Sequence, residues 1–298
     1  MTKHKDTKTP RRQEGRIKGL WIAAFLVPLC LCVFVFSQTP QLPTELSQVR
    51  FNSGQDIVPY FEGWIRNPDG TFDLVFGYFN RNWKQELAIP AGADNKVEPS
   101  GPEAGQPTYF LARRQRWVFR LRVPADFGNK EVTWTITANG RTETAYGSLL
   151  AAQEINDRVV SSNGNLDPGE GDPNEPPSIT VPRSQTVSAT APLTLTASVR
   201  DDGLPKPRPP RTPRATAPGG FGAQVDRAAA GPPKGLSVSW LQYAGPGKAV
   251  FGTTDAIPVA NGQAATTVRF SQPGIYRLRA IANDGALSTS ADVVITVN

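Results

Sequence analysis

Carboxylates, guanidinium groups and aromatic rings are the side chains with which this 298-residue chain could act on a ligand. Imidazole and thiol groups are confined to its start, since the one histidine is His4 and the two cysteines are Cys30 and Cys32. A Ser-His-Asp triad, a cysteine nucleophile and a Cys/His zinc site therefore lack the necessary residues in the rest of the chain. No GxxxxGK[ST] or GxGxxG sequence is present, which leaves nucleotide binding without support.

Paired carboxylates are the catalytic arrangement that remains, because glycoside hydrolysis needs two of them beside the scissile bond. The candidates are Glu62, Asp73, Glu86 and Glu103, and no spacing singles out a pair. We therefore rank a carboxylate-dependent glycosidase below a non-enzymatic role.

Two aromatic residues of the first half are candidates for ligand contact. Trp83 lies in the polar sequence Asn80-Arg81-Asn82-Trp83-Lys84 after an expected strand, and Tyr109 is a second candidate. Exposed rings of this kind stack on sugars, which predicts a carbohydrate-binding module as the alternative function. Aromatic residues at alternating strand positions belong more often to a core, and that interpretation is favoured for the others.

Arg113, Arg114 and Arg116 form a basic cluster in the first half of the chain. They predict either a site for an anion or acidic polymer, or a solvated edge strand that resists pairing with other strands. The second interpretation is favoured. Lys206, Arg208, Arg211 and Arg214 form another basic cluster, for which a passive insert is favoured over contact with anionic polymers.

Oxygen-bearing residues suggest two places for a cation. Asn163, Asn165, Asp167 and Glu170 resemble the start of a calcium loop, but Pro168 stands where such a loop has glycine, so a linker is favoured over a Ca²⁺ site. No other cofactor is expected.

Carboxylates at loop ends are the second place. Asp201, Asp202 and Asp284 could share a cation, although an aspartate near a glycine more often caps a turn, and turns are favoured here.

An apolar run near the start predicts export. Segment 19–37 contains no charged residue, whereas residues 1–18 hold seven Lys/Arg against two Asp/Glu. A basic region before such a run stays cytoplasmic, so we expect the rest of the chain to cross the membrane. The run is either a signal peptide cleaved before Gln38 or a transmembrane anchor. The expected location is the periplasm, the cell surface or the medium.

Residues 51–155 show the alternation of an antiparallel β-sandwich. Asn67-Pro68-Asp69-Gly70 is a turn sequence that predicts a first hairpin, and Asn139-Gly140 predicts a second. A short helix is expected near 147–158, and residues 156–177 are expected to be a linker. The residues predicted to face inward are Phe72, Leu74, Phe76, Tyr78, Trp117, Phe119, Leu121, Val123, Val132, Trp134 and Ile136.

Residues 178–298 predict a second β-sandwich, with short strands from 187 to 297 and glycine-containing turns. The sequences TLTASVRDDGLP (194–205), LSVSWLQYAGPGKAVF (236–251) and TTVRFSQPGIYRLRAIANDGALSTSADVVITV (266–297) resemble PKD-like and related immunoglobulin-like modules of bacterial exported proteins. That resemblance implies an extracellular, non-catalytic module that acts as a spacer or contacts proteins and carbohydrates. Residues 206–235 depart from the pattern, and their Pro, Arg, Ala and Gly content predicts a disordered insert.

The predicted protein is thus all-β, with a hydrophobic leader or anchor helix followed by two antiparallel sandwiches, the second immunoglobulin-like. We expect a non-enzymatic interaction or spacer module whose partner is an envelope protein or a polysaccharide. Nucleic acid is not an expected partner, because beyond residue 18 the chain is nearly neutral, with 25 Lys/Arg against 24 Asp/Glu.

Overall fold

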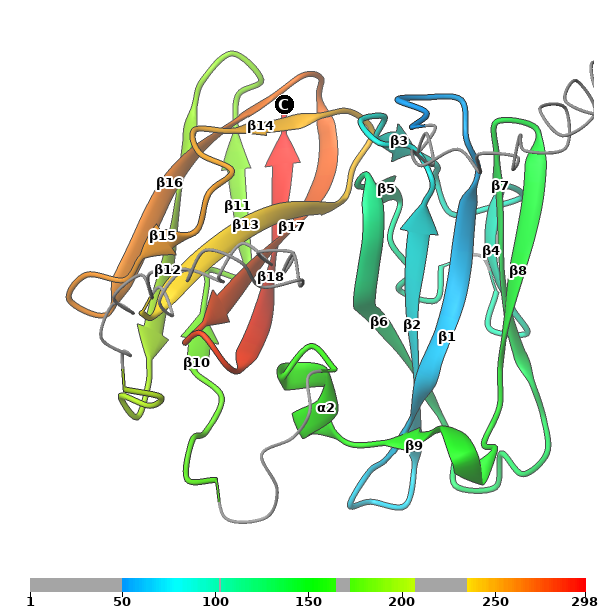
Figure 1. Ribbon diagram of the computed structural model, residues 1–298. Helices are drawn as coiled ribbons and strands as arrows, with labels where there is room; N and C mark the ends of the chain where they lie inside the picture. Colours follow the sequence, from blue (N-terminus) through cyan, green and yellow to red (C-terminus); the bar gives the residue numbers. More distant parts are fainter. Residues whose placement is uncertain (1–49, 102, 165–171, 207–234) are drawn as a thin grey trace, which may run out of the picture. The chain divides into compact units, whose positions relative to one another are not determined.

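A computed structural model describes residues 50–101, 103–164, 172–206 and 235–298 (Figure 1). The basic start, the apolar segment 19–37, the calcium-loop candidates Asn165, Asp167 and Glu170, and nearly all of the insert 206–235 lie outside the described residues. Within the described residues, no helix combines the length and the apolarity needed to cross a membrane. Arg50–Asn298 group as one compact unit, which the following paragraphs describe.

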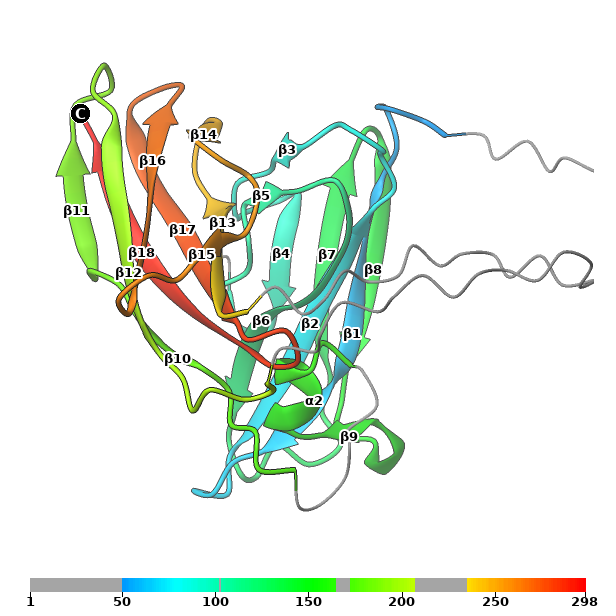
Figure 2. The ribbon, with the colours of Figure 1, turned by 60° about the vertical axis from the view of Figure 1, so that its left-hand side comes forward.

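The first sandwich consists of two sheets and a two-stranded ribbon (Figure 2). The four-stranded sheet has the order β6-β2-β1-β9, and the three-stranded sheet has the order β4-β7-β8. Most pairings are antiparallel as predicted, but β9 runs parallel to β1. The bounds are β1 (Ile57–Arg66), β2 (Phe72–Asn80), β3 (Leu87–Ala88), β4 (Asn95–Glu98), β5 (Tyr109–Phe110), β6 (Arg113–Val123), β7 (Val132–Ala138), β8 (Arg141–Gly147) and β9 (Glu154–Ile155).

The alternating residues that were predicted to face inward lie in the core of the first sandwich, with one exception. Phe72, Leu74, Phe76 and Tyr78 of β2 are all buried, and both predicted hairpin turns form. Trp117 was expected in the inward row of β6, and this is wrong: it is half-buried, with φ of 55°.

A pair of β-bulges explains the position of Trp117. Phe76 pairs with Phe119 but Tyr78 pairs with Gln115, so residues 116–118 of β6 lie opposite Gly77 alone. On the other side of β2, β1 bulges at Glu62. Extra residues unpair locally and re-aim side chains, so Trp117 leaves the core face while Phe119 and the residues after it stay on it.

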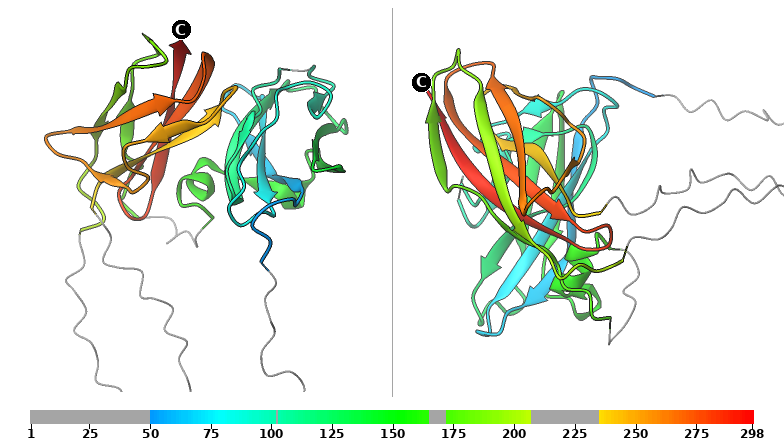
Figure 3. Two further views of the ribbon diagram at one scale, coloured as in Figure 1. Left: turned by 90° about the horizontal axis from the view of Figure 1, so that it is seen from above. Right: turned by 90° about the vertical axis from the view of Figure 1, so that its left-hand side faces the viewer.

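The second sandwich is built from two sheets (Figure 3). Its strand order is that of an immunoglobulin-like domain. Its first sheet, β10-β12-β16-β14, matches the ABED order of that fold. Its second sheet, β11-β18-β17-β13-β15, contains the GFC order as β18-β17-β13, with β11 and β15 added at its edges. The predicted antiparallel pairing holds except that β11 runs parallel to β18. The bounds are β10 (Ser178–Thr180), β11 (Ser184–Val187), β12 (Leu193–Arg200), β13 (Ser237–Ala244), β14 (Ala249–Phe251), β15 (Ile257–Pro258), β16 (Gln263–Phe270), β17 (Gly274–Asn283) and β18 (Ser288–Val297).

Two side chains show how this sandwich is held without cysteines. Trp240 is buried on β13, the strand that carries the core tryptophan of immunoglobulin domains. Tyr276 is buried near the start of β17, and its hydroxyl donates to the Gln272 carbonyl at 2.8 Å, as in a tyrosine corner. Two positions further on, where antibody domains have a cysteine, the fully buried Leu278 provides apolar packing.

Two short helical turns lie after strand β8 of the first sandwich. A 3₁₀ turn, η1 (Ala151–Gln153), precedes a one-turn helix, α2 (Asp157–Ser161), capped by the Asn156 side chain, which accepts from the Val159 N–H at 2.9 Å. The predicted short helix is therefore displaced toward the residues expected to begin the linker.

Candidate binding surface along strand β6

The arginine–aromatic surface, as we call it, comprises rings and guanidinium groups that lie together on and beside the four-stranded sheet. Strand β1 provides Tyr60, β2 provides Phe79, and the loop after β2 provides Trp83. The bulged half of β6 provides most of the cations. The members are Arg50, Tyr60, Phe79, Trp83, Arg113, Arg114, Arg116 and Trp117.

Trp83 is held between backbone and cations. Its backbone N–H donates to the Phe51 carbonyl at 2.8 Å, which fixes the loop. The guanidinium carbons of Arg50 and Arg113 both lie 4.5 Å from the centroid of its ring, which is 39% exposed. Arg113 also lies 4.9 Å from the Phe79 ring. A sugar ring that stacked on Trp83 would therefore compete with guanidinium groups already in place.

Arg114 is positioned by a ring and a buried carboxylate. Its guanidinium carbon lies 4.1 Å from the centroid of Tyr60, and Nη2 donates to Glu62 Oε1 at 2.6 Å. Burial raises the pKa of Glu62, and the positive charges of Arg114 and Arg116 partly oppose that rise. Gly77 leaves room for this carboxylate, because a Cβ there would lie 2.4 Å from Glu62 Oε1.

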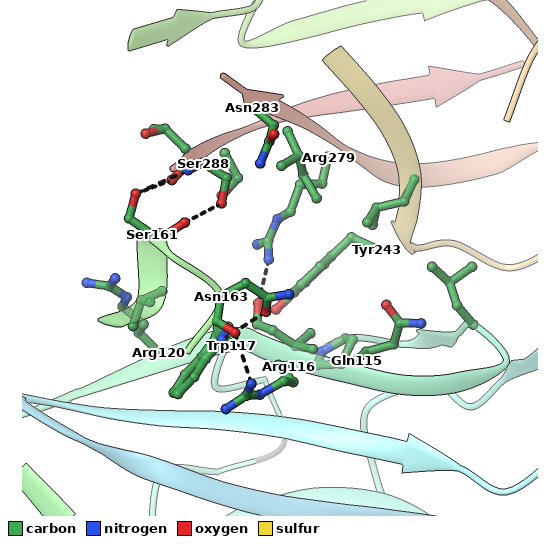
Figure 4. A pocket seen from close by; sticks show the side chains of 18 of the residues that line it. Gln115, Arg116, Trp117, Arg120, Ser161, Asn163, Tyr243, Arg279, Asn283 and Ser288 are labelled. Atoms are coloured by element: carbon green, nitrogen blue, oxygen red, sulfur yellow. Dashed lines mark hydrogen bonds between the residues drawn. The ribbon is translucent and has the colours of Figure 1, made fainter. Parts of the chain in front are cut away.

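Arg116 lies over the indole that the bulge turns outward. Its guanidinium carbon is 4.6 Å from the Trp117 ring centroid, and Nη1 donates to the Asn163 carbonyl at 2.9 Å. Trp117 Nε1 donates to Asn163 Oδ1 at 3.2 Å (Figure 4). Asn163, predicted as a possible calcium ligand, therefore has both of its oxygens engaged by these neighbours.

The surface is electropositive because few of its cations are neutralised. Within the described part of the chain, Arg50, Arg113 and Arg116 form no ion pair with a carboxylate, whereas Arg114 pairs with Glu62. A guanidinium on a ring keeps its N–H edge available for oxygen acceptors, which suits recognition of carboxylate, sulfate or phosphate groups.

A cleft of about 770 Å³ continues the surface past Arg116 (Figure 4). It is lined by β6, by α2 and by strands β13, β17 and β18, with Arg116, Arg120, Arg279 and Ser288 among its polar groups. Arg279 is paired with Asp292 at 2.7 Å, lies 4.2 Å from the Tyr243 ring centroid, and donates to the Val118 carbonyl. This arginine thus occupies the backbone acceptor that the bulge exposes on the edge strand.

Four of the five predicted contact residues, Trp83, Arg113, Arg114 and Arg116, lie on the surface. Tyr109, the fifth, is only 6% exposed, and its hydroxyl donates to Glu86 Oε2 at 2.8 Å. Its ring therefore is not the exposed platform that was expected, although it borders the cleft. Sequence reasoning missed Arg50, Tyr60 and Arg279, and the only local signal was the arginine cluster 113–116 directly before Trp117.

The glycosidase candidates are mostly engaged elsewhere. Glu62 is paired with Arg114, and Asp73 lies 3.0 Å from Arg122 Nε and accepts from Asn67. Glu86 is held by Tyr109 and by Lys248 Nζ at 2.8 Å. In the described ranges, no three His, Cys, Asp or Glu side chains form a metal-binding group.

No protein-family model and no curated protein matches the chain. Among solved structures it is similar to the D00-D0 domain of intimin, at 12% identity over 82% of this chain and 100% of that chain, with a TM-score of 0.25. A chimeric titin Z1Z2 is similar at 15% identity over 42% of this chain and 96% of that chain, with a TM-score of 0.24. Since these scores are low, the immunoglobulin-like assignment depends on the strand order described above.

Proposed function

We propose that the protein is a non-enzymatic binding module, exported across the cytoplasmic membrane, that holds an acidic polysaccharide through the arginine–aromatic surface. The observation that carries the proposal is that Arg50, Arg113 and Arg116 are held on aromatic rings with no carboxylate partner in the described residues. The second sandwich would serve as the spacer that the resemblance to immunoglobulin-like modules implies.

Pre-organisation favours binding at these positions. A free arginine loses side-chain freedom when it grips a ligand, whereas one already stacked on a ring has lost part of it on folding. Spaced cations along one strand suit a polymer that repeats its anionic group, since each weak contact raises the effective concentration for the next. A neutral sugar would gain less, because it must share the Trp83 ring with two guanidinium groups.

Binding to polygalacturonate and to neutral dextran tests the proposal, measured by calorimetry on the full chain in mild detergent. We expect polygalacturonate to bind, and the Arg113→Gln/Arg116→Gln variant to bind at least about tenfold more weakly, because a charged hydrogen bond contributes about 1.5–3 kcal/mol. Raising the salt concentration should weaken wild-type binding.

Arg183→Gln is the matched control, since Arg183 is also an exposed arginine without an ion pair in the described residues, but lies in the second sandwich. Equal binding by both variants would reject the surface. Equal affinity for dextran and for polygalacturonate would favour a module that binds neutral carbohydrate. If the protein binds an acidic protein or a nucleic acid but not polygalacturonate, an acidic polysaccharide is rejected as the partner.

A further inference from the structure

Three separate segments of the chain come to the end of the second sandwich where β10 begins (Figure 1), and side-chain oxygens from all three lie there. Asp201 and Asp202 follow β12, Asp284 lies in the turn between β17 and β18, and Asn174 precedes β10. Ser178 pairs with Arg200, which brings the residues before β10 alongside those after β12. The Glu175 N–H accordingly donates to Asp202 Oδ2 at 2.9 Å.

Part of each carboxylate has the turn-capping role that was predicted. Asp201 Oδ2 accepts from the Gly203 N–H at 3.0 Å, and Asp202 Oδ1 accepts from the Leu204 N–H at 2.8 Å. Asp284 Oδ1 accepts from the N–H groups of Ala286 and Leu287 at 2.6 and 2.7 Å. These bonds confirm the turns, but they leave other oxygens to be explained.

Two buried oxygens in this cluster have no donor. Asn174 is 3% exposed, and its Nδ2 donates to Asp284 Oδ2 at 3.2 Å, yet its Oδ1 has no partner. Asp201 Oδ1 is likewise buried and unpartnered. Trp240 Nε1 is the one other buried side-chain atom without a partner in the described residues. Unpaired buried acceptors are costly and call for a specific explanation, such as a bound ion.

The charges of the three carboxylates in this cluster also favour a bound ion. Asp201, Asp202 and Asp284 form no ion pair with any Lys or Arg of the described ranges. Burial raises the pKa of Asp201, and the nearby negative charges of Asp284 and Asp202 raise it further. Negative charge is therefore concentrated around acceptors that lack donors. The nearest described cation is Arg158, whose Nη1 donates to the Asn174 carbonyl at 2.8 Å and whose carboxylate partner is Asp172.

We propose that this end of the sandwich binds a hard divalent cation, with Asp201 Oδ1, Asn174 Oδ1 and Asp284 Oδ2 as ligands. Carboxylate and amide oxygens are the donors that Ca²⁺ prefers, and the absence of nitrogen and sulfur donors argues against zinc. Two carboxylates and one amide do not fill the 6–8 positions of Ca²⁺, so water and backbone carbonyls complete the shell. The cation would fasten the segment before β10 to β12 and to the β17–β18 turn.

Calcium titration of the full chain in mild detergent tests this site, by calorimetry and by thermal unfolding with CaCl₂, MgCl₂ or EDTA. We expect heat of binding with CaCl₂, and a Tm higher by about 5 °C at a hundredfold excess over Kd. Asp201→Asn should weaken Ca²⁺ binding at least about tenfold, and Asn174→Ala should also weaken it.

The conditions without metal separate a ligand from a merely structural residue. In EDTA, Asp201→Asn should have a Tm equal to or above that of the wild type, because the variant removes a negative charge that lies close to those of Asp284 and Asp202. Asp255→Asn, an exposed aspartate of the same sandwich, should leave binding and Tm unchanged. The site is rejected if the wild type shows no response to either cation, if Asp201→Asn still binds Ca²⁺ like the wild type, or if that variant is less stable in EDTA. Should Asp201→Asn not fold, the wild-type titration and Asn174→Ala decide.

Discussion

The two sandwiches differ in what fills their cores. The first is packed with large rings, among which Phe76 stacks on Phe119 at 5.2 Å and Trp134 meets Phe119 edge-on at 4.9 Å. The second has fewer rings, namely Trp240, Phe270 and Tyr276, and is otherwise packed with small and branched side chains, including the buried Ala197, Ala264, Ala280 and Ala282. The first core therefore concentrates its stabilisation in a few side chains, whereas the second distributes it over many contacts.

Their surfaces differ in charge as well. The first sandwich gathers cations on rings, and the second gathers carboxylates at one end, beside the segment that joins it to the first. If both proposals hold, the two all-β units of this chain have different roles: the first binds a partner, and the second is stabilised by a cation.

Trp134→Ala is the strongest way to break the first sandwich. Trp134 is fully buried, and its Nε1 donates to Asn95 Oδ1 at 3.0 Å, so truncation leaves a cavity and an unpaired buried acceptor. We expect a loss of about 3–5 kcal/mol in the free energy of unfolding, measured by urea denaturation. Trp83→Ala at the surface should cost much less, and an equal cost for both would refute the concentration of stability in the aromatic core.

Gly77→Ala tests whether the bulges depend on the absence of a side chain. An added Cβ would lie 2.4 Å from Glu62 Oε1 and 2.6 Å from the Gln115 carbonyl, and the backbone atom cannot move aside easily. We expect a destabilisation of about 1–3 kcal/mol together with weaker polygalacturonate binding. Gly235→Ala is the control, since a Cβ at Gly235 meets no atom within 4 Å. Similar unfolding midpoints for the two variants would contradict the close approach.

Glu62→Gln should produce the smallest effect, visible in the pH dependence of stability. Because the folded-state pKa of Glu62 is raised above its ordinary value of 4.5, the folded protein binds this proton more tightly than the unfolded chain does. That contribution is present at low pH and is lost as pH rises from 4.5 through the raised pKa. The urea midpoint of unfolding should therefore fall less steeply between pH 4 and pH 7 for Glu62→Gln than for the wild type. Parallel plots of midpoint against pH for the two proteins would contradict a raised pKa at Glu62.

Strand positions were the most predictable part of the structure, because alternation reports directly which face of a strand is buried. The row Phe72 to Tyr78 is confirmed, and so are the Asn139-Gly140 turn and the β-sandwich character of both units. The bulge at 116–118 was not predictable, because it depends on Gly77 in another strand and leaves the local pattern intact.

The candidate site was predictable only in part, for a similar reason. Arg113, Arg114 and Arg116 are visible as a cluster in the sequence, but their ring partners Tyr60, Phe79 and Trp83 come from other strands and loops. Tyr109 was misjudged, because its short strand β5 turns the ring inward to reach Glu86. Asn174 could not have been connected with Asp201 and Asp284 before the pairing of β10 with β12 was known.

The guanidinium groups over Trp83 and Trp117 give the molecule an internal optical reporter. Trp64, Trp134 and Trp240 are buried, so the surface-accessible indole emission of the described residues comes mainly from the two rings that lie beneath Arg50, Arg113 and Arg116. Iodide is drawn to that positive charge and caesium is repelled, so the anionic quencher samples these rings preferentially. Occupancy of the surface can thus be followed by fluorescence on unlabelled protein.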